Sequence, residues 1–200
     1  MSTRASFYTI LVVLGCCAYI FGFAVEFMLD PLGRSPVLDA NENLAWAGLI
    51  ADGQLPDEPL YRALLYPWVL SLFHVEGALL AQLATLFGVL CHGLNALLVA
   101  LLAGRLWRQR AAAWFSGILY ALYPVSMYFS VQVLDMAFAM ALFLAGIYCV
   151  VRASEATSLR SRSRWGYHIA AGLLLGLSVL ARPNFLLPLF CVPLAPFILQ

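Results

Sequence analysis

Five charged residues in this sequence are suited to chemistry at a membrane surface: Asp39, Glu42, Arg62, Asp135 and Arg182. A carboxylate in that setting can act as a general base on an acceptor hydroxyl or amine. The planar guanidinium of arginine presents a fork of donors that suits a phosphate group. The sequence therefore favours a site that combines proton abstraction with recognition of a lipid phosphate.

Each candidate also has a plain structural interpretation. Asp39 and Glu42 have the spacing of a charged variant of the capping box at a helix start. Asp135 stands where an apolar run meets a turn, although an ionisable group close to hydrocarbon is a functional candidate by default. Arg182 stands at a similar edge, where a long basic side chain can simply extend to the interface.

The composition places the chain among integral membrane proteins. It has 200 residues, 64% of them hydrophobic and 10% charged, whereas soluble domains are roughly 45–50% apolar and about 25% charged. The mean hydropathy is +0.90. A net charge of +1 gives no basic field for nucleic acid.

Apolar runs of membrane-spanning length predict an all-α polytopic protein with a single transmembrane domain over residues 1–200. The first run has a basic start like a secretory signal, but it is long for one and no clear cleavage site follows, so we expect it to stay as a span. Five or six spans are expected, at residues 7–29, 78–104, 111–130, 136–151, 167–181 and 185–199.

Residues 30–77 are expected to form a loop outside the membrane. Its polar core holds half of the ten acidic residues, namely Asp39, Glu42, Asp52, Asp57 and Glu58. The pattern of residues 39–53 predicts a helix with Asp39 as its cap and Gly53 at its end. Residues 60–73 are apolar and aromatic but interrupted by a proline, which indicates a segment lying at the interface.

The arginines predict the orientation of the chain. Alternating spans place most of the eleven basic residues on one side, at Arg4, between residues 105 and 110 and between residues 152 and 164. The positive-inside rule makes that side cytoplasmic. The candidate carboxylates and Arg182 then share the outer face. The outer loop has no N-x-Ser/Thr acceptor site, so we expect a bacterial inner membrane with a periplasmic loop.

The sequence predicts no metal centre from cysteine or histidine spacing. The five cysteines all lie in apolar runs without a CxxC pair, which is typical of small buried hydrophobic residues. No cofactor is expected, with a divalent cation held by carboxylates as the alternative.

The order of four motifs resembles the N-terminal portion of a membrane glycosyltransferase. The motifs are LDANENLAWAGLIADG, EPLYRALLYPWVLSLF, YALYPVSMYFSVQVLDMAFAMAL and GLLLGLSVLARPNFLLPLF. The chain is similar to GT-C-type enzymes of the protein-mannosyltransferase and aminoarabinose-transferase kind, family 39-like. Those proteins generally carry more spans, so the resemblance implies an N-terminal portion or a shortened member.

The resemblance implies roles for the candidate residues. Asp39 matches the loop carboxylate proposed as catalytic base, and Glu42 and Asp135 would orient the acceptor. Arg182, from the Arg-Pro pair, and Arg62 would bind the lipid phosphate. The expected activity is inverting transfer of a sugar from a polyprenyl-phosphate-linked donor to a protein, lipid or glycan acceptor.

Two other functions remain open from the sequence. A non-catalytic scaffold or lipid-binding subunit would keep the architecture without the chemistry. A small transporter would need charges or broken helices at mid-membrane, whereas the charged groups here lie at span ends.

Overall fold

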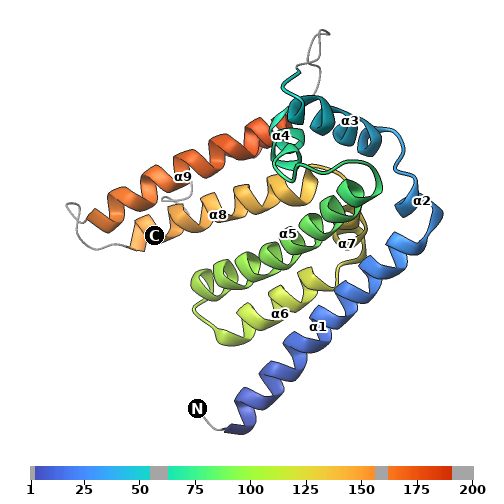
Figure 1. Ribbon diagram of the computed structural model, residues 1–200. Coiled ribbons are helices and arrows are strands. Elements are labelled where there is room, and N and C mark those ends of the chain that lie inside the picture. Colours follow the sequence, from blue (N-terminus) through green and yellow to red (C-terminus); the bar gives the residue numbers. More distant parts are fainter. Residues whose placement is uncertain (1–2, 55–62, 156–161, 191–200) are drawn as a thin grey trace.

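A computed structural model describes residues 3–54, 63–155 and 162–190, and every regular element in these ranges is helical (Figure 1). The expected all-α class is therefore confirmed. The elements are α1 (Thr3–Leu29), α2 (Pro31–Arg34), α3 (Asp39–Ala51), α4 (Leu65–Ser71), α5 (Gly77–Leu106), α6 (Arg110–Ala121), α7 (Pro124–Val131), α8 (Met136–Glu155), α9 (Arg162–Ala181), the 3₁₀ turn η1 (Pro183–Phe185) and α10 (Leu186–Leu189).

Three of the helices in the described residues are long and apolar enough to cross a membrane. They are α1 through its segment Val12–Leu29, the 30-residue α5, and the 20-residue α8. Helix α9 is as long as α8, but its first half carries Arg164 and His168, which lower its hydropathy. The chain is an integral membrane protein by these helices.

The predicted span at residues 111–130 is two helices instead of one. Helix α6 ends at Ala121 and α7 begins at Pro124. Proline has no backbone N–H to continue a helix, and it drives the preceding residue out of the helical region. Tyr123 accordingly has an extended backbone, with φ −70° and ψ 111°. The expectation of one continuous span here was wrong for this reason.

The helices pack as two neighbouring hairpins. Helix α5 lies against α6, and α8 lies against α9, with α5 also packed on α8. Figure 1 shows α2, α3, α4 and α7 at one end of these helices, which we call the loop end, while the last turns of α5 and α8 and the first turns of α6 and α9 lie at the other. The loop end gathers the segment that the sequence marks as polar.

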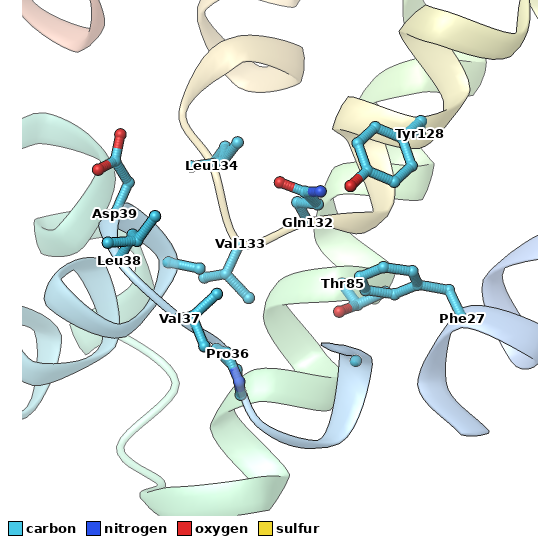
Figure 2. Close-up of a pocket in the computed structure, with 12 residues that line it drawn as sticks. Phe27, Pro36, Val37, Leu38, Asp39, Thr85, Tyr128, Gln132, Val133 and Leu134 are labelled. Carbon is cyan, nitrogen blue, oxygen red and sulfur yellow. The ribbon is translucent and has the colours of Figure 1, made fainter. Parts of the chain in front are cut away.

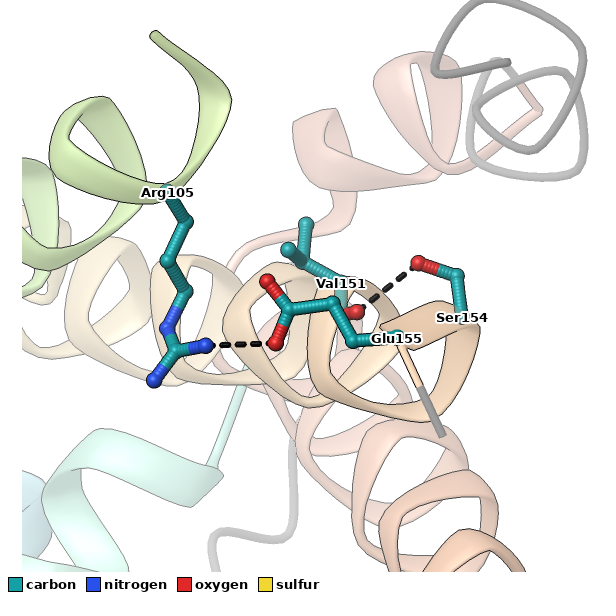
Figure 3. Close-up of polar contacts among 4 residues, drawn as sticks. All are labelled: Arg105, Val151, Ser154 and Glu155. Carbon is teal, nitrogen blue, oxygen red and sulfur yellow. Dashed lines mark hydrogen bonds and ion pairs between the residues drawn. The ribbon is translucent and has the colours of Figure 1, made fainter. Parts of the chain in front are cut away.

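An ion pair joins the two hairpins at the end away from the loop. Arg105 of α5 donates to Glu155 of α8 at 2.5 Å (Figure 3), and its guanidinium also lies 5.4 Å from the centroid of the Tyr148 ring. Both charged partners are substantially exposed, so the pair adds little to the free energy of folding.

Helix α3 begins and ends close to the predicted residues. Gly53, with φ +72°, ends the helix, and the Gln54 N–H donates to the Leu49 carbonyl, as in a Schellman motif. The predicted cap differs by one residue: Leu38 occupies the N-cap position, because its carbonyl accepts from the Glu42 N–H. Asp39 is the first residue of the helix.

A substitution at Gly88 tests the packing that holds α7. A Cβ atom on Gly88 would collide with the backbone carbonyl oxygen of Ser130, whereas nothing lies within 4 Å of a Cβ on Gly93 of the same helix. We expect Gly88→Ala to destabilise the protein by about 1–3 kcal/mol and Gly93→Ala to leave it unchanged or slightly more stable. Thermal unfolding of the two variants in detergent measures this, and equal melting temperatures would contradict the packing.

Candidate functional site

The connection between α7 and α8, residues 132–135, lies beneath α3 at the loop end. Val131 and Val133 are almost fully buried. The side-chain amide of Asn43, on α3, donates to the Val133 carbonyl at 2.9 Å. A buried carbonyl without a partner would cost free energy, so this bond fixes α3 over the connection.

A cavity of about 340 Å³ opens between α1, α3 and the connection (Figure 2). Figure 2 shows Asp39 and Leu38 on one side, with Leu134, Gln132 and Tyr128 facing them across the opening. Asp39 is exposed at the edge of this cavity. The lining residues are Phe27, Gly33, Pro36, Val37, Leu38, Asp39, Ala40, Thr85, Tyr128, Gln132, Val133 and Leu134.

Asp135 and Arg182 form an ion pair immediately beside this cavity. The Arg182 guanidinium donates to a carboxylate oxygen of Asp135 at 2.8 Å. Asp135 directly precedes α8 and Arg182 directly follows α9, so the pair joins the ends of this hairpin. The side chains are 25% and 30% exposed, which leaves both groups accessible to a ligand.

An aromatic cluster of Tyr66, Phe87 and Phe138 packs α4 against α5 and α8. The Tyr66 ring of α4 lies 6.1 Å from that of Phe138 and 6.4 Å from that of Phe87. The pKa of the Tyr66 hydroxyl is raised, first by burial and then by electrostatic interaction with Cys91 and Asp135. The Tyr66 hydroxyl therefore stays protonated and can only be a neutral hydrogen-bonding group at physiological pH.

The structure brings three of the five predicted residues to one region. Asp135 contacts Arg182 directly, and Asp39 shares its cavity with Leu134, the neighbour of Asp135. Glu42 lies on the same helix as Asp39, half-buried and away from the lining of the cavity. Arg62 lies outside the described residues. The site roles of all five residues stay predictions.

Sequence reasoning missed the residues that shape the cavity. Asn43 follows Asp39 by four positions, about one helical turn, so the sequence could predict that both lie on the same face of α3. It could not predict that Asn43 bonds to Val133. Thr85, Tyr128 and Gln132 come from segments that looked like ordinary membrane spans and turns.

Among residues 3–54, 63–155 and 162–190, no group of three or more His, Cys, Asp or Glu side chains is placed to hold a metal ion. The chemical groups that the region offers are thus an accessible carboxylate and a carboxylate–guanidinium pair. Such a set can accept a proton and bind an anion.

Comparison with known proteins gives one family. The family model described as dolichyl-phosphate-mannose-protein mannosyltransferase matches residues 57–199, more than two thirds of the chain. The matched part contains Asp135 and Arg182, while Asp39 and Glu42 precede it. The curated proteins and the solved structures gave no match.

Asn43→Ala tests the bond that holds α3 over the connection. The change leaves the buried Val133 carbonyl without its donor, which costs about 1–3 kcal/mol. The exposed Asn41 of the same helix gives the control, because Asn41→Ala removes no such bond. Hydrogen exchange across residues 39–51 should accelerate in the first variant and stay unchanged in the second. Unchanged exchange in both would show that the Asn43 bond does not hold the helix.

Proposed function

The chain belongs to the dolichyl-phosphate-mannose-protein mannosyltransferase family, a family of membrane glycosyltransferases, and we propose that it transfers a sugar from a polyprenyl-phosphate carrier to an acceptor at the loop end. The observation that carries this proposal is the Asp135–Arg182 pair beside the cavity that Asp39 borders. An anion-binding group and an accessible base would then flank one opening.

The proposed reaction is a single displacement with inversion. The acceptor hydroxyl or amine gives its proton to the Asp39 carboxylate as it attacks the anomeric carbon of the sugar. The bond from that carbon to the phosphate oxygen breaks, and the polyprenyl phosphate leaves with the electron pair. A general base contributes roughly 10²- to 10⁴-fold to such a step.

Arg182 would stabilise the departing phosphate. Negative charge grows on the phosphate oxygens as the bond breaks, and a positioned guanidinium favours that charge through charge-assisted hydrogen bonds. Arg62 would contact the same headgroup. Glu42 and Asp135 would orient the acceptor, and a divalent cation between carboxylates is the alternative for Asp135.

We place the loop end at the periplasmic face of a bacterial inner membrane, with the N-terminus in the cytoplasm. The support is the distribution of arginine: the ends of α5, α6, α8 and α9 away from the loop end carry Arg105, Arg110, Arg152 and Arg164. The positive-inside rule assigns such basic segments to the cytoplasm.

A scaffold without activity is the second candidate, and the same ion pair favours it. In that function the mutual neutralisation of Asp135 and Arg182 would serve to tie α8 to α9. A transferase would show transfer activity that depends on Asp39, whereas a scaffold would show no transfer activity. Measuring that activity therefore distinguishes the two functions.

Asp39→Asn tests the proposed base. The amide cannot take the proton, so transfer from a polyprenyl-phosphate sugar should fall about 10²-fold or more. Asp52→Asn, an exposed change at the other end of α3, is the matched control and should keep full activity. Radiolabelled sugar transfer in membrane vesicles measures both. Full activity in Asp39→Asn would exclude this residue as the base.

Cysteine labelling tests the proposed orientation. Ser35 lies exposed between α2 and α3, and Gln109 lies exposed between α5 and α6. In intact spheroplasts a membrane-impermeant maleimide should label Ser35→Cys, while Gln109→Cys should react only after the membrane is permeabilised. The wild-type chain gives the background from its own cysteines. The reverse pattern would invert the topology.

A further inference from the structure

The Tyr66 hydroxyl has no function in the site as described so far. The residue is 1% exposed, and its hydroxyl oxygen is buried with no hydrogen-bond partner among the described residues. Buried polar groups are nearly always hydrogen-bonded, because an unmet donor loses its hydration without compensation. A buried tyrosine without a partner therefore suggests a second state in which the hydroxyl is bonded.

The Tyr66 ring lies beside the start of α8, which Asp135 directly precedes. The Tyr66 ring packs on Phe138 at 6.1 Å, and Phe138 follows Asp135 by three residues, so both lie on the same face at the start of α8. The charge of Asp135 acts on the Tyr66 hydroxyl and, after burial and Cys91, contributes to the rise in its pKa. The carboxylate is thus a neighbour that the hydroxyl does not yet contact.

A ligand anion at Arg182 would disturb the present pair. Asp135 now accepts from one guanidinium nitrogen of Arg182. A phosphate bound to the same guanidinium would lie next to the carboxylate. Two neighbouring negative groups repel each other. The repulsion falls if the carboxylate turns away and finds another donor.

We propose that Tyr66 is a positioning residue, an inference that rests on the proposed function. When Arg182 binds the phosphate headgroup of a prenyl carrier, the Tyr66 hydroxyl donates a hydrogen bond to the Asp135 carboxylate. One ion pair opens, one hydrogen bond from Tyr66 forms, and no covalent bond or proton changes hands. The aromatic rings of Phe87 and Phe138 pack against the Tyr66 ring, so in this proposal the Asp135 side chain is the group that moves.

Binding of farnesyl phosphate to the full chain in nanodiscs tests this exchange, with farnesol and inorganic phosphate as parallel ligands. Tyr66→Phe removes only the hydroxyl. We expect it to raise the Kd for farnesyl phosphate roughly tenfold, since a hydrogen bond to a charged group is lost in the bound state alone. The exposed Tyr123→Phe is the matched control and should bind as the wild type does.

Two further measurements separate the exchange from a merely structural role. Without ligand, Tyr66→Phe should melt no lower than the wild type, because the hydroxyl has no bond to lose. In an Asp135→Ala background, Tyr66→Phe should leave the Kd unchanged. Ligand binding should also shift the near-ultraviolet tyrosine absorbance of the wild type, and Tyr66→Phe should abolish that shift.

The outcomes distinguish this inference from the proposed function. An unchanged Kd in Tyr66→Phe, or the same loss with and without Asp135, overturns the exchange and leaves the transferase proposal standing. A wild-type chain that binds no farnesyl phosphate overturns both. If inorganic phosphate binds equally well and shows the same dependence on Tyr66, the exchange is supported and the lipid origin of the anion is refuted.

Discussion

The architecture depends on supplying hydrogen bonds to backbone carbonyls where helices break inside the bundle. Membrane interiors offer no water to an exposed carbonyl, so each break needs a donor from the protein itself. At the end of α6 the carbonyl of Ala121 accepts from the buried His92 of α5 at 3.1 Å. In the connection after α7 the carbonyl of Val133 accepts from Asn43. These two donors satisfy carbonyls at the breaks before and after α7, and the second break carries the backbone to Asp135.

The same connection explains how charged groups can sit beside an apolar core. Asp135 directly precedes α8, at the point where the buried segment reaches the surface of the bundle, and Arg182 meets it from the end of α9. Because both side chains stay about one quarter to one third exposed, their attraction is screened and adds modestly to stability. A weak, accessible pair is easier for a ligand to open than a fully buried one, whose separated charges would be costly. Its exposure therefore suits an exchangeable contact better than a permanent one.

Much of this arrangement was predictable from local patterns, and the remainder depended on partners distant in sequence. Apolar runs predicted α1, α5 and α8, and the Asp39–Gly53 pattern predicted α3, because each signal lies within one segment. Counting spans predicted that Asp135 and Arg182 lie at the same end of the helices, although it did not predict their direct contact. The break before Pro124 was visible as a proline, but hydropathy alone favoured a continuous span. The bond from Asn43 to Val133 joins residues 90 positions apart, and the local sequence around either residue does not predict its partner.

The region that matches the family begins after Asp39, so the match alone does not connect the proposed base with Asp135 and Arg182. The connection is physical: Asn43 lies one turn beyond Asp39 and is bonded to the segment that leads into Asp135. Any displacement of that segment must move α3 or break a buried hydrogen bond, so the base and the ion pair keep a fixed relation across the cavity. A transferase needs such a relation, because the acceptor proton and the leaving phosphate are on opposite sides of the carbon under attack. A scaffold would not require an exposed carboxylate held at a set place beside an ion pair. The Asn43 bond therefore supports the proposal that Asp39 acts together with Asp135 and Arg182.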